Sequence, residues 1–187
     1  VVKITELLKE DILAFPYVIK PLREGSSLGV YIIHNREDLV KAQQTWQYGD
    51  ECLAERYIPG REIQVAILGD RAIGAIEIRP KEEFYDYHAK YTEGCADHIM
   101  PANIPEKDYQ EALELALKAH KALGCESVTR VDLRYDEIQN PAKFYVLEVN
   151  TQPGLTPLSL VPEIAAYHGM NYGDLLEWMI ENPRYPH

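Results

Sequence analysis

The segment Phe144–Gly154, with the sequence FYVLEVNTQPG, is predicted to form a β-strand that ends in a turn. Side chains alternate between the two faces of a strand, so Glu148 and Asn150 are expected to share one face. The apolar residues expected on the other face are Tyr145, Leu147 and Val149. Pro153 and Gly154 end the strand, because neither supports continued pairing. A carboxylate and an amide oxygen on one face are the hard-oxygen ligands that Mg²⁺ or Mn²⁺ takes.

A second strand, predicted over Val128–Tyr135 (VTRVDLRY), gives this segment a partner. If the two strands pair in antiparallel fashion, both apolar faces meet one core and both polar faces coincide. Asp132, Glu148 and Asn150 are then expected to lie close together, and Arg130 beside them. Such a concentration of oxygen atoms is repulsive unless cations lie between them. The pattern favours a divalent-metal site over the alternative, a solvated sheet face with Arg–carboxylate pairs.

The composition limits the class of protein. The 187-residue chain is 46% hydrophobic and 26% charged, as expected for globular domains. Its net charge of −11 argues against a general nucleic-acid-binding protein, which needs a basic face. No apolar run is long enough to span a membrane, and the first residues show no signal-peptide pattern. The three widely spaced cysteines predict neither a disulfide framework nor a zinc site, which fits a cytoplasmic protein.

Hairpins mixed with helices predict an α+β fold with mostly antiparallel sheets and packed helices. Gly69 and Asp70 predict a hairpin between strands at Ile63–Leu68 and Ala72–Arg79. The long stretch Pro80–Pro105 is predicted to be an irregular binding loop or lid.

Lys107–Leu123 has the clearest helical pattern, and Gly124 is expected to end it. The residues expected on its buried face are Leu113, Ala116 and Leu123. Other helices are predicted at Ile4–Leu13, from a cap at Asn35 to about Gln47, at Leu160–His168, and from a cap at Asn171 to Glu181.

Phe15–Lys20 and Val30–Ile33 are predicted to form a hairpin around the polar loop Arg23–Gly29 (REGSSLG). The backbone N–H groups of such a loop can wrap a polyphosphate, with Lys20 adjacent, although the order is not that of a Walker A loop. A simple turn is the alternative. Lys90 is a second candidate phosphate contact, and an ordinary exposed lysine is the alternative there.

Four motifs resemble, in this order, those of the D-alanine–D-alanine ligases of the ATP-grasp superfamily. They are IKPLREGSSLGV from residue 19, FYDYHAKY from residue 84, TRVDLRY from residue 129 and LEVNTQPGLTPLSLVP from residue 147. The resemblance covers nearly the whole chain. It implies that residues 1–60 form part of the central ATP-grasp lobe and that residues 61–187 form the C-terminal domain with the metal site and the ω-loop.

The resemblance also implies roles for individual residues. Lys20 and Lys90 contact the phosphates of ATP, and Glu62 holds the ribose hydroxyls. The mobile phosphate loop corresponds to Glu24, Gly25, Ser26 and Ser27. The adenine-binding hinge corresponds to Glu55, Arg56, Tyr57 and Ile58. The ligands of two Mg²⁺ or Mn²⁺ ions are Asp132, Glu148 and Asn150. The catalytic residues are Ser26, Lys90, Tyr91 and Arg130, and the substrate-binding residues are Arg130, Gly154, Ser159 and Leu160.

The implied reaction joins two D-alanines for peptidoglycan precursor synthesis. ATP phosphorylates the carboxylate of the first D-alanine, and the amine of the second attacks the resulting acylphosphate. Arg130 stabilises the oxyanion, while closure of residues 80–105 excludes water. The resemblance further implies that the full-length protein is a homodimer.

Some positions depart from the family pattern. Gln152 stands where a small serine is usual, His88 where an acid is common, and Arg56 where lysine is frequent. The family's N-terminal domain, with an acid that orients the first D-alanine, and an upstream ATP-binding lysine match no residue of this chain. The 187 residues alone are therefore expected not to catalyse ligation, and D-alanine-dependent phosphate release by them would contradict this expectation.

Other functions stay open at this point. A D-alanine–D-lactate ligase is the nearest alternative enzyme, and Tyr91 after Lys90 favours an amine acceptor. Another ATP-grasp carboxylate–amine ligase is a broader alternative. A non-catalytic nucleotide-binding module is the alternative from a different class, and the retained site residues argue against it.

Overall fold

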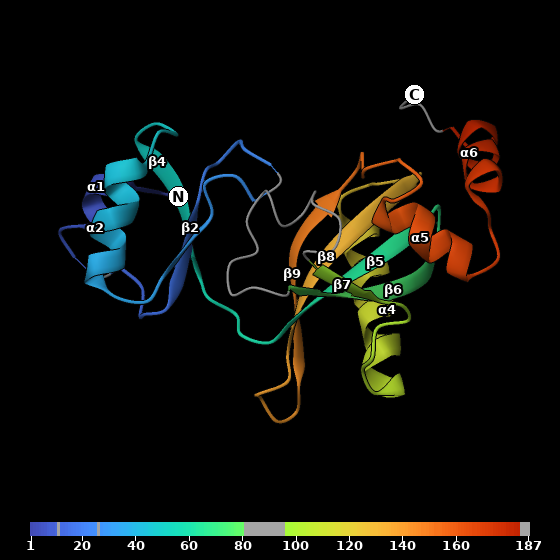
Figure 1. The fold of residues 1–187 in the computed structure, drawn as a ribbon, viewed down its shortest axis with the longest axis horizontal. Coiled ribbons are helices and arrows are strands. Elements are labelled where there is room, and N and C mark those ends of the chain that lie inside the picture. Colours follow the sequence, from blue (N-terminus) through green and yellow to red (C-terminus); the bar gives the residue numbers. More distant parts are fainter. Residues whose placement is uncertain (11, 26, 81–95, 184–187) are drawn as a thin grey trace. The chain divides into compact units, whose positions relative to one another are not determined.

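The computed structural model describes residues 1–10, 12–25, 27–80 and 96–183, which form two compact units (Figure 1). The first unit comprises Val1–Ile58, and the second comprises Pro59–Arg79 and the residues from Asp97 onward. Each unit combines an antiparallel sheet with helices, so the predicted α+β class is confirmed. None of the helices in the described parts of the chain has the length and apolarity needed to cross a membrane.

The first unit is a four-stranded sheet with the order β1-β4-β2-β3. Its strands are β1 (Val2–Lys3), β2 (Tyr17–Lys20), β3 (Tyr31–Ile33) and β4 (Glu51–Arg56), and its helices are α1 (Ile4–Leu7) and α2 (Arg36–Thr45). The predicted hairpin is confirmed, since β2 and β3 pair with Tyr17 opposite Ile33. The cap at Asn35 is confirmed too, because its side chain accepts a hydrogen bond from the Asp38 N–H at 3.0 Å.

The predicted helix Ile4–Leu13 is wrong in its length. α1 ends at Leu7, and two residues later the Lys9 N–H bonds back to the Glu6 carbonyl in a turn. The physical reason is a tertiary contact. The guanidinium of Arg36 donates to the carbonyls of Leu7 and Leu8, which a continuing helix would use for its own hydrogen bonds.

The second unit is a five-stranded sheet with the order β7-β6-β5-β8-β9. Its strands are β5 (Arg61–Leu68), β6 (Arg71–Pro80), β7 (Ala96–Ile99), β8 (Val128–Asp136) and β9 (Lys143–Asn150), and its helices are α4 (Glu106–Ala122), α5 (Leu160–Tyr167) and α6 (Tyr172–Glu181). α4 packs on one face of this sheet over a core that includes Ile63, Val65 and Leu133. The predicted hairpin at Gly69 is confirmed, with Leu68 opposite Arg71.

Two expectations in the second unit are wrong. The stretch Pro80–Pro105 is not irregular throughout, because β7 adds an edge strand to the sheet; residues 81–95 lie outside the described part. On the predicted buried face of α4, Ala116 is buried and Leu113 packs partly buried against the core, but Leu123 is wrong, because it is 67% exposed. Ala112 and His120 are the other buried residues of this helix. Leu123 lies beyond the helix, next to Gly124 at a φ of +67°, so the chain has already turned away there.

The pairing of β8 with β9 contains a register shift. Asp132 lies opposite Glu148, but Leu133 lies opposite Val146, so Leu147 is an extra residue on β9. The strict alternation expected along β9 is therefore wrong. The residues that share the core-facing side with Val131, Leu133 and Tyr135 are Val149, Val146 and Phe144, and not Tyr145 and Leu147.

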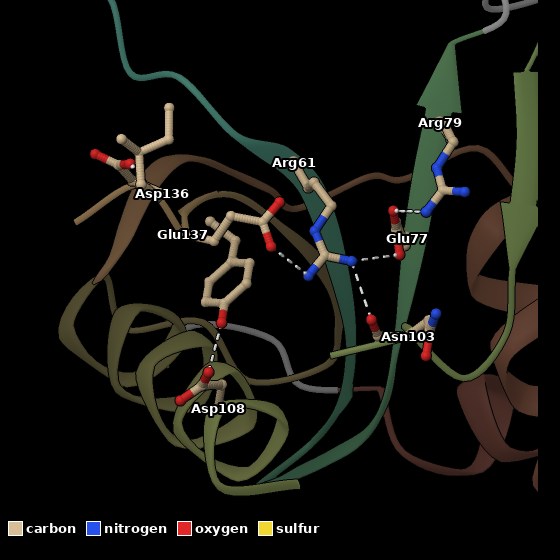
Figure 2. A network of polar contacts seen from close by, with 9 residues as sticks. Arg61, Glu77, Arg79, Asn103, Asp108, Asp136 and Glu137 are labelled. Carbon is tan, nitrogen blue, oxygen red and sulfur yellow. Dashed lines mark hydrogen bonds and ion pairs between the residues drawn. The ribbon is translucent and has the colours of Figure 1, made fainter. Parts of the chain in front are cut away.

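Arg61 is the centre of a polar network on the α4 side of the sheet (Figure 2). Its guanidinium contacts Glu77 at 3.2 Å, Glu137 at 3.0 Å and the Asn103 carbonyl at 3.0 Å. The Glu77 side chain is only 1% exposed, and Arg79 also contacts it at 2.8 Å. One half-buried arginine thereby connects β5, β6, the turn after β7 and the loop after β8.

Tyr135 extends this network towards α4. Its ring lies under the Arg61 guanidinium, 5.3 Å from the ring centroid, and its hydroxyl donates to Asp108. Burial and the hydrogen bond to Asp108 raise the pKa of Tyr135 to about 12. The phenol therefore stays a neutral donor throughout the physiological pH range.

We expect Arg61→Met to lower the free energy of unfolding by about 3–5 kcal/mol, because it leaves the carboxylate of Glu77 buried with one outer partner. Arg79→Met is the matched control, since Arg79 contacts the same carboxylate from a side chain that is 53% exposed, and it should cost about 1 kcal/mol or less. Urea unfolding measures both. If both variants lost the same free energy of unfolding, Arg61 would be no more important to the network than the exposed Arg79.

Candidate functional site

Three neighbouring strands place polar residues in rows across one face of the second unit's sheet, the face opposite the α4 core. In one row, Asp132 of β8 lies between Gln64 of β5 and Glu148 of β9. In the next row, Arg130 lies opposite Asn150. The cluster predicted from the sequence is therefore assembled by strand pairing, although its metal-binding role stays a prediction.

Arg130 and Asp132 form a bidentate pair. The guanidinium donates from Nε to Oδ1 at 2.7 Å and from Nη2 to Oδ2 at 2.9 Å. The Asp132 side chain is 5% exposed and that of Arg130 is 19% exposed. The alternative interpretation was a solvated sheet face with Arg–carboxylate pairs. The Arg–carboxylate pair is present, but it is largely shielded from solvent.

Burial controls the charge state of both groups. It raises the pKa of Asp132, and the hydrogen bonds and charge of Arg130 oppose this rise. Burial alone would lower the pKa of Arg130, but its hydrogen bonds to Asp132 and the charges of Asp132, Glu148 and Glu62 raise it overall. The site thus keeps a permanently charged guanidinium among three carboxylates.

The donor set suits a hard cation. Asp132 and Glu148 provide carboxylates on adjacent strands, and Asn150 provides an amide that now donates to Glu148 at 3.3 Å. Each carboxylate oxygen of Asp132 retains a lone pair beyond its bond to Arg130. Within the described ranges there is no group of three or more His, Cys, Asp or Glu side chains arranged for a metal. A cation here would complete its coordination with water or ligand oxygens, which is the usual behaviour of Mg²⁺.

The same sheet face holds one residue that the sequence analysis missed. Gln64 is 3% exposed, and its Nε2 donates to Glu62 Oε1 at 2.7 Å. The signal was present in β5, because Glu62 and Gln64 are two polar residues at alternate positions, followed by the apolar run Val65–Leu68.

The turn between β9 and α5 brings together two of the predicted substrate-binding residues. Ser159 precedes the first residue of α5, Leu160, and its Oγ accepts a hydrogen bond from the Thr156 N–H at 3.0 Å. A Cβ atom on Gly154 would lie 3.0 Å from that same Oγ, so the backbone approaches closely here. The turn presents the N-terminus of α5, where backbone N–H groups favour a carboxylate.

The first unit carries a separate set of candidates. Lys20 of β2 and Glu55 of β4 form an ion pair of 2.5 Å on the sheet face opposite the buried Tyr17 and Ile19. The pair was not foreseen, since both residues were assigned to a ligand. Glu55 thus neutralises the lysine within the protein itself.

The loop after β2 contains tight turns at Gly25–Val30. The Leu28 N–H bonds to the Gly25 carbonyl at 3.1 Å, and Ser27 has a φ of +61°. Gly29, at a φ of +69°, leaves no room for a side chain, because a Cβ atom would lie 2.3 Å from the Tyr48 ring.

The remaining predicted residues divide into two groups. Arg56 ends β4, and Tyr57 and Ile58 follow it, with the Tyr57 N–H bonded to the Pro16 carbonyl at 3.4 Å. Glu24 precedes the turns of the phosphate-loop candidate. Three predicted residues, Ser26, Lys90 and Tyr91, lie outside the described residues, so their roles stay predictions.

The chain is similar to known proteins along almost its whole length. A family described as "D-ala D-ala ligase C-terminus" matches residues 3–181. A D-alanine–D-alanine ligase from Paramagnetospirillum magneticum is 52% identical over 93% of this chain, and one from Granulibacter bethesdensis is 48% identical over 96%. The chain covers 57% and 59% of these two relatives, so it spans about three fifths of their length.

Solved structures agree with the sequence relatives. A D-alanine–D-alanine ligase from Bacillus anthracis, complexed with ATP, superimposes with a TM-score of 0.74 at 30% identity, covering 92% of this chain and 53% of that one. The VanG D-Ala:D-Ser ligase from Enterococcus faecalis gives a TM-score of 0.78 at 31% identity, covering 95% of this chain and 51% of that one.

The buried ion pair of the site leads to a stability prediction. We expect Arg130→Met to lower the free energy of unfolding by about 3–5 kcal/mol at neutral pH, because Asp132 loses its buried partner. Without Arg130 the pKa of Asp132 rises further, so the loss should become smaller as the pH falls towards about 4.

Two further variants make this test specific. Arg134→Met is the matched control, because Arg134 lies four residues further along the same strand face and donates to the Gly60 carbonyl at 2.7 Å. The double variant Arg130→Met/Asp132→Leu should regain most of the stability. Chemical unfolding at several pH values measures all three, and a pH-independent loss for Arg130→Met would contradict the assignment.

Proposed function

The chain belongs to the D-ala D-ala ligase C-terminus family, whose solved relatives have the ATP-grasp fold, and on this premise we propose that it supplies the ATP- and metal-binding part of an ATP-dependent D-alanine–D-alanine ligase. The product would be D-alanyl-D-alanine, a precursor of peptidoglycan. The observation that carries the proposal is the direct opposition of Asp132 and Glu148 across two strands, with Arg130 opposite Asn150 in the next row.

In this proposal, Asp132, Glu148 and Asn150 hold two divalent ions, Mg²⁺ or Mn²⁺. When bound, such ions neutralise charge on the phosphates during phosphoryl transfer. Arg130 remains fixed by the Asp132 carboxylate at a bidentate geometry, so its position does not depend on the substrate. A guanidinium held in this way can stabilise the oxyanion that forms when the amine attacks the acylphosphate.

The turn before α5 would receive the carboxylate of the second D-alanine. Gly154, Ser159 and the N-terminal residue Leu160 provide a close backbone approach, a hydroxyl and a helix N-terminus. Binding the carboxylate there orients the amine for attack. This function is supported by the geometry of the turn and by the motif that contains it.

Lys20 and Glu55 would serve the nucleotide in the first unit. Their ion pair keeps the lysine oriented on the polar sheet face until a phosphate competes for it. Glu62 would hold the ribose hydroxyls. The two metal ions, a homodimeric assembly and a cytoplasmic location follow from the resemblance, and they stay predictions.

We expect Asp132→Asn to weaken Mn²⁺ binding in the presence of ADP by about tenfold or more, because one ligand charge is lost. Asp136→Asn is the matched control: Asp136 is also buried on β8 and lies about 13 Å further along the strand. Electron paramagnetic resonance of free Mn²⁺ measures the affinity. Equal affinities for the two variants would remove Asp132 from the metal site.

The acceptor of the reaction requires its own experiment. At the full length of its relatives, the enzyme should release phosphate from ATP with D-alanine as the second substrate, and more slowly with D-serine or D-lactate. D-serine is included because one structural relative is a D-Ala:D-Ser ligase. Coupled phosphate release and mass spectrometry of the dipeptide are the measurements. A preference for D-lactate would establish the alternative ligase, and no release with any acceptor would contradict the proposal.

A further inference from the structure

The strongest unexplained feature of the sheet face is the amide oxygen of Gln64. The side chain is 3% exposed, and its Oε1 is buried with no hydrogen-bond partner among the residues that the structure describes. Its other end, Nε2, donates to Glu62 Oε1 at 2.7 Å. Leaving a buried acceptor unpaired costs free energy, so this oxygen is a candidate for binding a ligand.

The orientation of the amide is fixed by its neighbour. An ionised carboxylate only accepts hydrogen bonds, so Glu62 requires the NH₂ end of Gln64 to point towards it. Rotating the amide by half a turn would place two acceptors against each other. The oxygen of Gln64 is therefore held on the side away from its contact with Glu62.

The neighbouring strands cannot satisfy this oxygen. Asp132, directly opposite on β8, is a carboxylate that accepts from Arg130 and has no hydrogen to donate. Ile76, opposite on β6, is apolar. What the oxygen lacks is a donor, and the described residues of its row do not provide one.

We propose that Gln64 binds and positions the sugar of the nucleotide. Nε2 orients Glu62, and Oε1 accepts a hydrogen bond from one ribose hydroxyl while Glu62 accepts from the other. Two acceptors at alternate positions of one strand face complement the two donors of a vicinal diol. This inference rests on the proposed function, because it assumes that the ligand is a nucleotide.

A leucine at this position separates binding from folding. Gln64→Leu has a similar size and removes the unpaired oxygen, so the melting temperature of the free protein should not fall. The nucleotide affinity should fall instead. If Gln64 served only the packing of the sheet, Gln64→Leu would lower the melting temperature and leave the nucleotide affinity unchanged.

The test is isothermal titration of the protein with ADP, 2′-deoxy-ADP and 3′-deoxy-ADP, in EDTA. We expect Gln64→Leu to weaken ADP binding by about tenfold and to abolish the preference for ADP over one of the deoxy analogues. Gln110→Leu is the matched control, because Gln110 makes the same kind of contact with Glu106, at 2.8 Å, on the exposed side of α4. It should bind all three nucleotides as the unaltered protein does.

The outcomes distinguish this inference from the proposed function. If the unaltered protein fails to bind ADP, the proposed function is contradicted. If it binds ADP but Gln64→Leu binds all three nucleotides normally, or loses affinity for all three equally, the assignment of Gln64 is wrong. An effect that requires added Mn²⁺ would also overturn it, since the oxygen would then serve a cation. Gln64→Met provides the same comparison if the leucine variant does not fold.

Discussion

The antiparallel pairing of β8 with β9 is the constraint on which the candidate site depends. It brings Asp132 opposite Glu148 and Arg130 opposite Asn150, from segments separated by an intervening loop. The register shift after Asp132 leaves these polar pairs unchanged and places Val146 and Phe144, in place of Leu147 and Tyr145, opposite Leu133 and Tyr135 of β8. Leu147 is the extra residue of β9 at this shift.

β5 divides its residues between two buried polar systems on opposite sides of one sheet. Arg61 lies on the α4 side, where it neutralises Glu77, whereas Glu62 and Gln64 lie on the side of Asp132. The first system pairs its charges within the protein and fixes how β5, β6 and the turn after β7 fit together. Among the described residues each system leaves one buried polar atom unpaired, the donor Nε of Arg61 in the first and the acceptor Oε1 of Gln64 in the second. Only the acceptor of Gln64 lies on the face of the candidate site.

Strand alternation together with the expected antiparallel pairing predicted the cluster of Asp132, Glu148, Asn150 and Arg130, because residues two apart on a strand share a face and paired residues share it too. The hairpin at Gly69 and the caps at Asn35 and Asn171 were predictable for a similar reason, since each depends on residues within a few positions. Local patterns failed where distant residues decided the result. α1 stops because Arg36 takes its carbonyls, and Leu123 lies beyond α4 in solvent.

The sequence by itself determined the α+β class and the family, and it named the candidate site residues, because these depend on side-chain identity and on short-range periodicity. Only the tertiary structure decided the register of β9, the ion pair of Lys20 with Glu55, and the burial of Gln64 beside Glu62. Each of these depends on which strand lies next to which, and on how tightly the neighbouring backbone excludes water. Pairing between distant segments fixes the strand neighbours and the exclusion of water. The periodicity of a single segment does not encode that pairing.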